Sequence, residues 1–255
     1  MLTAVSRNSS LALRRNPIGF LKPCLPHYIF LKLPLLSRSR GTLWASFPEI
    51  ASKQLIFEIN MHINHQFLNQ EFFLPNWKIE TLVLGTFNPK CGEITDYYYG
   101  RNRNRFWRAM ENITGNENYY YQNSFERKKL LMEKYKFGCT DIIKSVVINE
   151  NFAHRICGNG YSDSSLFTLR EVTANYQFTE IKDYLITEKV KKVINTWGTR
   201  NNPNIFVNQI NDLEIFCQQH GIIFIRNCPS PSPRARINFN ILLNFYRRHI
   251  FNIIE

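Results

Sequence analysis

Short apolar runs alternate with longer amphipathic segments along most of this chain, a pattern typical of an α/β domain. The apolar runs predict four strands, at residues 81–86, 137–142, 190–196 and 222–226. The amphipathic stretches predict five helices, at residues 104–113, 125–135, 180–188, 204–220 and 237–252. Because strands separated by helices usually form a parallel sheet covered on both faces, we expect a three-layer αβα fold around a central four-stranded parallel sheet.

Local signals refine the ends of these elements. Thr179 is the predicted N-cap of the helix that starts at Glu180, and Gly221 is predicted to end the helix before the last strand. The polar segment 147–165 contains Gly158 and Gly160 and is predicted to be a long loop.

The first 60 residues differ from the rest, because they are rich in arginine, serine and proline and the first acidic residue is Glu49. Three interpretations remain open: an organellar transit peptide, a disordered basic arm that adds DNA affinity, or a non-native extension with translation starting at Met61. We favour the third, which leaves a domain at 61–255. We therefore expect a cytoplasmic, nucleoid-associated protein, with organellar import only if residues 1–60 are a genuine transit peptide.

The charge and the cysteines narrow the classes of partner and site. A net charge of +12 favours a polyanionic partner, either nucleic acid or an anionic membrane. No apolar run is long enough to span a bilayer, and the C-terminal helix is too weakly patterned to bind a membrane surface. The six cysteines include no C-x-x-C pair, so we expect no metal site, and buried reduced thiols in an intracellular protein.

The stretch 81–107 carries the first candidate site. An apolar run ends at Gly85 and leads into a turn with Pro89, and open α/β sheets bind ligands at such strand ends. Three tyrosines at 97–99 and alternating arginines and asparagines at 101–105 follow. Aromatic rings stack on bases, arginines neutralise phosphates and amides read base edges. The alternative is a tyrosine-rich strand with solvated charges. Three consecutive tyrosines cannot all point inward on one strand.

The second candidate site is the stretch 227–236, NCPSPSPRAR, between the last strand and the last helix. Prolines stiffen this loop, while hydroxyls, backbone amides and two arginines suit phosphate oxygens. The alternative is a rigid turn without a ligand. Because both stretches follow strand ends, a parallel sheet would bring them to the same edge.

These two stretches together resemble motifs of the uracil-DNA glycosylase superfamily, closest to its deoxyinosine/hypoxanthine and mismatch-specific uracil/thymine branches. The matching residues are GTFNP at 85–89, YYGRNRNRFW at 98–107 and PSPSPRA at 229–235, with weaker matches at 137–141 and 162–166. The pattern departs from the family where Asn102 replaces a proline and where the segment 147–165 is longer. Both departures fall on the expected pocket and bear on base preference.

The resemblance implies a monofunctional DNA glycosylase that hydrolyses the N-glycosidic bond of a flipped-out deaminated base, uracil or hypoxanthine, in base excision repair. It implies a monomer that binds DNA containing a damaged or mismatched base, with no metal and no organic cofactor. By this match the base is held by Gly85, Thr86, Phe87 and Tyr99. The residues predicted to contact DNA are Arg101, Arg103, Arg105, Ser230, Ser232 and Arg234. Phe106 and Trp107 lie in a helical pattern and are predicted core residues.

Cleavage of the bond needs a donor to the leaving base and a positioned water. The candidates for these roles are Asn104, slightly favoured, and Asn88, with Asp96 or Glu93 to activate the water. Each has a structural alternative: a helix cap for Asn104, a turn for Asn88 and a solvated charge for the carboxylates. Lys90 keeps a lyase step open. The rival functions are a non-catalytic nucleic-acid-binding protein on the same fold, or a hydrolase of another nucleobase-containing substrate.

Overall fold

The protein is described by a computed structural model covering residues 59–116, 124–158, 160–169, 171–197 and 204–253. The chain is divided after Gln54, and every described residue belongs to the second unit, Leu55–Glu255. The predicted extension 1–60 therefore lies outside the described residues, apart from Ile59 and Asn60.

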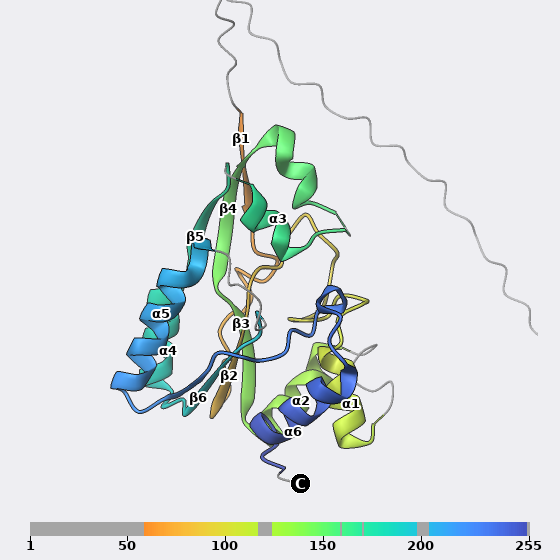
Figure 1. Ribbon diagram of the computed structural model, residues 1–255, viewed down its shortest axis with the longest axis vertical. Helices are drawn as coiled ribbons and strands as arrows, with labels where there is room; N and C mark the ends of the chain where they lie inside the picture. Colours follow the sequence, from red (N-terminus) through yellow and green to blue (C-terminus); the bar gives the residue numbers. More distant parts are fainter. Residues whose placement is uncertain (1–58, 117–123, 159, 170, 198–203, 254–255) are drawn as a thin grey trace, which may run out of the picture. The chain divides into compact units, whose positions relative to one another are not determined.

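A four-stranded parallel sheet forms the centre of the second unit (Figure 1). Its strands are β2 (Thr81–Gly85), β3 (Phe137–Asp141), β6 (Lys192–Asn195) and β7 (Ile223–Ile225), in the order β3-β2-β6-β7. Every residue of β2 and β3 is buried, as expected for strands covered on both faces. The predicted α/β class and the four parallel strands are confirmed.

Helices flank this sheet at the places that the sequence predicts. They are α1 (Phe106–Thr114), α2 (Phe125–Tyr135), α4 (Phe178–Thr187), α5 (Asn204–Gln219) and α6 (Phe239–His249). Helix α1 packs against α6, and α4 packs against α5. Figure 1 shows α4 and α5 on one side of the sheet and α1, α2 and α6 on the other, which is compatible with three layers. Phe106 and Trp107 are fully buried, as predicted.

A second, antiparallel sheet was not predicted. It consists of β1 (Asn60–Asn64), β4 (Ile143–Asn149) and β5 (Thr173–Tyr176), in the order β1-β4-β5. The prediction of one loop over 147–165 is therefore wrong, because β4, the 3-10 helix η1 (Glu150–Arg155) and α3 (Asp163–Thr168) occupy most of it. Strands β1 and β5 are largely exposed or half-buried, so their sequences lack the apolar run of a covered strand.

The helix-end predictions had mixed outcomes. Thr179 is not an N-cap, because α4 already begins at Phe178 and is preceded by Gln177. Gly221 does follow α5 as predicted, with a φ of 67° that favours glycine, and its N–H donates to Gln218. No described helix is long and apolar enough to cross a membrane.

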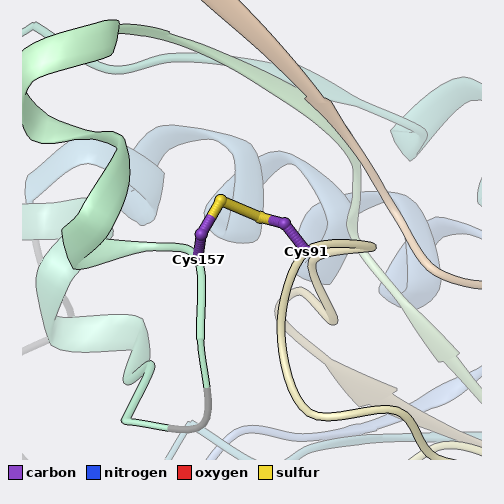
Figure 2. The surroundings of a disulfide bond; sticks show 2 residues. All are labelled: Cys91 and Cys157. Carbon is purple, nitrogen blue, oxygen red and sulfur yellow. A yellow bond between two sulfur atoms is a disulfide. The ribbon is translucent and has the colours of Figure 1, made fainter. Parts of the chain in front are cut away.

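The cysteines correct another expectation. Cys91 and Cys157 form a disulfide bond, which joins the loop after β2 to the loop after η1 (Figure 2). The other described cysteines, Cys139, Cys217 and Cys228, are free and buried, as the sequence predicts. The prediction of reduced thiols is thus confirmed for these three cysteines and wrong for the bonded pair. The scattered spacing hid the pair because its members are 66 residues apart.

Candidate nucleic-acid binding site

The order of the parallel strands locates the place where a ligand would bind. The chain passes from β2 to β3 at one edge of the sheet and then crosses to β6 on the other side of β2. In open α/β sheets, ligands bind outside the carboxyl ends of the two strands at such a switch point. Here those ends are followed by Thr86 after β2 and Thr196 after β6. Both threonines are buried.

Tyr99 is anchored at this switch point. Its hydroxyl lies 3.0 Å from Thr196 Oγ1, and the Thr196 hydroxyl donates its own proton to the Leu84 carbonyl at 2.8 Å. Tyr99 is therefore the donor in the bond to Thr196. Its ring stacks on Phe106, with centroids 4.6 Å apart. Burial raises the pKa of Tyr99 well above its usual value, so that the hydroxyl keeps its proton.

The backbone sets Tyr99 apart from its two neighbours. Tyr99 has a φ of 59°, an unfavourable conformation for an aromatic residue, while Tyr97 and Tyr98 are fully buried. These tyrosines lie in bends and turns rather than in a strand, so the alternation argument did not apply. The turn buries two rings in the core and leaves Tyr99 half-buried at the switch point.

Gly85 allows a buried carboxyl group to approach the end of β2. A Cβ at Gly85 would lie 2.1 Å from Asp141 Oδ1 and 3.1 Å from the Tyr99 hydroxyl. The other oxygen, Asp141 Oδ2, lies 2.9 Å from His65 Nε2. Because His65 Nδ1 accepts from the Phe67 N–H at 3.0 Å, its proton is on Nε2 and is donated to Asp141. The strand ends thus hold a buried, paired carboxyl group.

A second carboxyl group lies beside the first motif. Asp163 Oδ1 accepts from the Tyr161 hydroxyl at 3.0 Å, and the same carboxyl group hydrogen-bonds the Thr86 side chain. Arg101 lies 4.7 Å from the centre of the Tyr161 ring and donates to the carbonyls of Tyr161 and Phe87 at 3.5 and 3.3 Å. The segment before α3 is therefore tied to the end of β2.

The two predicted stretches meet through Arg105. Its backbone N–H donates to Pro231 at 3.0 Å, and its Nη2 donates to Ser232 at 3.1 Å and to Ser230 at 3.5 Å, in each case to the carbonyl oxygen. From the proline–serine loop, Arg234 in turn donates to the Gly160 carbonyl at 3.0 Å. Segments far apart in the sequence therefore converge at the carboxyl ends of the parallel strands.

The side chains predicted to contact DNA differ in whether they are bound within the protein or exposed to solvent. The side chains of Arg101, Arg105 and Arg234 are bound to carbonyl groups, although Arg234 is also exposed. Arg103 is exposed. Ser230 and Ser232 are half-buried. Arg103 is therefore the arginine of the 101–105 run that is best placed for a phosphate.

The predicted catalytic residues also have distinct surroundings. Asn104 Oδ1 accepts from the Phe106 N–H at 2.9 Å. The N-cap residue of α1 is Arg105, so the alternative that Asn104 is the helix cap is wrong. Asn88 is half-buried next to Phe87, which the sequence predicts to hold the base, and no described residue hydrogen-bonds the Asn88 side chain. Asp96 forms an ion pair with the buried Lys128, and Glu93 Oε1 accepts from the Asn102 N–H at 2.9 Å. Both carboxylates therefore have structural partners.

Sequence reasoning missed four residues of this site: His65, Asp141, Asp163 and Thr196. Asp141 and Thr196 carried a usable signal, because each is polar and stands at or just after the end of a buried strand. Asp163 lies in the segment 162–166, which was matched to the family without a role for this residue. His65 carried no signal, because only the folded chain brings it to the strand ends. Within the described ranges, no group of three or more His, Cys, Asp or Glu residues is arranged to hold a metal ion.

Comparison of the sequence with protein-family models and with curated proteins finds no match.

Proposed function

We propose that this protein is a monofunctional DNA glycosylase of the uracil-DNA glycosylase superfamily, acting on uracil or hypoxanthine in DNA. The observation that carries the proposal is the convergence of the tyrosine–asparagine turn and the proline–serine loop, which are joined by the Arg105 bonds to Ser230 and Ser232. Had these stretches lain on opposite sides of the sheet, no single slot for one nucleotide would exist.

Tyr99 supplies a platform for an extruded base. Its hydroxyl is fixed on Thr196 and one face of its ring is stacked on Phe106, so the ring cannot turn. A rigid aromatic ring stacks on any base at little entropic cost. The strained φ of 59° is of a kind that clusters at functional sites, which further supports a role for Tyr99.

Asn88 and Asn104 are the proposed polar contacts to the base and the water. Asn104 Oδ1 is occupied by the Phe106 N–H, so that its amide nitrogen is oriented as a donor. Asn88 stands beside Phe87 on the loop that follows β2. Amides hold such positions without titrating, which suits the stabilisation of a leaving base near neutral pH.

The net charge of +12 and the exposed Arg103 and Arg234 support DNA as the substrate. Binding through phosphates releases counterions, so the affinity should fall steeply with salt. Extrusion of a nucleotide costs a few kcal/mol and is easiest at a mismatch or in a single strand. We therefore expect duplexes with a mispaired uracil or hypoxanthine to be good substrates.

The test is incubation of the protein with oligonucleotides that carry uracil, hypoxanthine, xanthine or a G·T mismatch, followed by alkaline cleavage. Strand scission at the modified base is expected for uracil or hypoxanthine. No scission with any of the four contradicts the proposal. Scission without alkali would reveal a lyase step at Lys90.

Asn88→Ala and Asn104→Ala separate catalysis from binding. Loss of base release with retained DNA binding supports the proposed roles. DNA binding without base release in the wild-type protein would instead support the non-catalytic binder on the same fold. The hydrolase of another nucleobase-containing substrate would be recognised by base release from free nucleosides alone.

A further inference from the structure

Asp163 is a carboxyl group of the candidate site that the proposed catalytic asparagines leave without a role. It starts α3 and is held by the Tyr161 hydroxyl at 3.0 Å and by the side chain of Thr86, the residue that follows β2. Asp163 is half-buried. Its carboxyl group is therefore fixed at the carboxyl end of β2.

Burial favours the neutral form of Asp163. Burial is the largest cause that raises the pKa of Asp163, and the nearby Asp141 raises it further. Arg101 opposes this shift, as do hydrogen bonds from Thr86 and Tyr161, and the net pKa still lies above the ordinary value. Asp163 consequently keeps its proton to a higher pH than an exposed aspartate does.

Asp141 is less suited to give a proton to a ligand. Its Oδ2 is bound by the His65 N–H, its Oδ1 is pressed against Gly85, and only 4% of the residue is exposed. Where two carboxyl groups share a site and their surroundings differ, one commonly stays charged while the other serves as the acid. Asp163 is the more exposed of this pair.

We propose that Asp163 is the general acid of base release and transfers its carboxyl proton to the departing base. This inference rests on the proposed glycosylase function. The bond between C1′ and the base nitrogen breaks and its electron pair stays with the base, which takes the proton of Asp163. A water oxygen bonds to C1′ and returns its proton to the Asp163 carboxylate. The products are the neutral free base and an abasic site, so that one water is consumed and nothing is oxidised.

The test uses leaving groups of different quality. A general acid contributes about 10²–10⁴-fold, and it contributes less when the leaving group needs less protonation. We expect Asp163→Asn to lower the single-turnover rate by about 10²–10⁴-fold with uracil-containing DNA. With 5-fluorouracil, a better leaving group in the same duplex, the loss should be at least about tenfold smaller. Ser164→Ala, at the exposed next residue, is the matched control and should match the wild type with both bases.

The pH profile gives a readout that a merely structural role would not change. The wild-type rate should fall as the pH rises through the pKa of Asp163, and this limb should be absent in Asp163→Asn. Arg101→Met should move the limb to higher pH, because the cation that opposes protonation is removed, whereas Arg101→Lys should keep it near its original position. These Arg101 variants retain Asp163 and keep the test valid if Asp163→Asn fails to fold.

The outcomes distinguish a failure of the Asp163 role from a failure of the glycosylase function. Equal losses with uracil and 5-fluorouracil, or a limb that persists in Asp163→Asn or stays in place in Arg101→Met, would overturn the role of Asp163 and leave the glycosylase function intact. A wild-type protein that releases none of the tested bases would overturn the glycosylase function and this inference together.

Discussion

Arg105 Nη2 donates to the carbonyl oxygen of Ser232 at 3.1 Å, although 127 residues separate the two in the chain. The same guanidinium also reaches the carbonyls of Ser230, Pro231 and Ile237. An arginine that was predicted to contact DNA therefore holds the proline–serine loop in place. A side chain bound to several carbonyls is not available to a phosphate in this arrangement.

Arg105→Met should destabilise the protein by about 2 kcal/mol, because several carbonyls lose a charged donor. Base release should fall by about 10²-fold, since a small misplacement of the loop misaligns the bound nucleotide. Urea unfolding and single-turnover kinetics measure the two effects. An unchanged unfolding midpoint would show that the loop does not need Arg105.

Arg103→Met is the matched control, because Arg103 is exposed in the same run. It should leave the unfolding free energy within about 0.5 kcal/mol of the wild type. It should reduce the salt dependence of DNA binding by about one phosphate contact. We thus expect the Arg105 variant to affect mainly stability and the Arg103 variant to affect mainly DNA affinity.

The sequence predicted the central sheet and its helices because covered parallel strands and amphipathic helices leave strong patterns. It did not predict β1 and β5, whose exposed faces leave no apolar run. At the site, the first and second motifs were found through their composition and order. The partner of Cys91 and the position of His65 depend on contacts across more than 60 residues, which no local pattern encodes. The motif match covered the segment that contains Asp163 but could not place its carboxyl group beside Thr86.

Gly85→Ala tests the close approach of Asp141 to β2. The new Cβ would lie 2.1 Å from Asp141 Oδ1, so the carboxyl group would have to leave His65. We expect the unfolding free energy to fall by about 3 kcal/mol and base release to be lost. Gly160→Ala, where no atom lies within 4 Å of the added Cβ, should change stability by less than about 0.5 kcal/mol. Thermal melts compare the two, and equal effects would argue against the steric account.

Asp96→Asn tests whether this carboxylate acts on water or only balances Lys128. The Lys128 side chain is 1% exposed, so the loss of its partner should cost about 3 kcal/mol. The double variant Asp96→Asn/Lys128→Met removes both charges and should recover most of that stability. If Asp96 is structural, base release recovers as well. A stable double variant that releases no base would instead support the predicted role in water activation.

The disulfide should stabilise the site as well as the fold. It joins the loop that follows Asn88 to the loop that precedes Tyr161, across 66 residues of chain (Figure 2). For a loop of that length, chain entropy alone gives about 4 kcal/mol, and observed values are typically about 2–4 kcal/mol. Cys91→Ser/Cys157→Ser should therefore melt about 5–15 °C lower than the oxidised protein.

A dithiol reductant should lower the melting temperature of the wild type to that of the double variant and should have no effect on the variant itself. This comparison is the control for unrelated effects of the reductant, since the other described cysteines are free and buried. Alkylation of Cys91 and Cys157 would show that the reductant has broken the disulfide. An unchanged melting temperature of the wild type under those conditions would contradict the stabilising role.

Asp163 should make stability depend on pH independently of any catalytic role. Its pKa is raised in the folded protein, chiefly by burial, so between the ordinary aspartate pKa and this raised value the folded state holds more protons than the unfolded state. The contribution of Asp163 to the unfolding free energy should therefore be greatest below the ordinary pKa and fall as the pH rises through this window. Asp163→Asn should lose that dependence.

Urea unfolding of both proteins from about pH 3 to about pH 8 measures this difference. The unfolding free energy of Asp163→Asn minus that of the wild type should increase with pH across this window. Above the raised pKa this difference should become constant, because the carboxyl group is then charged in both the folded and the unfolded wild type. Asp183→Asn, at an exposed aspartate, should follow the wild type throughout. A constant difference at every pH would mean that burial does not favour the protonated form of Asp163, and the proton that base release is proposed to use would have to come from another group.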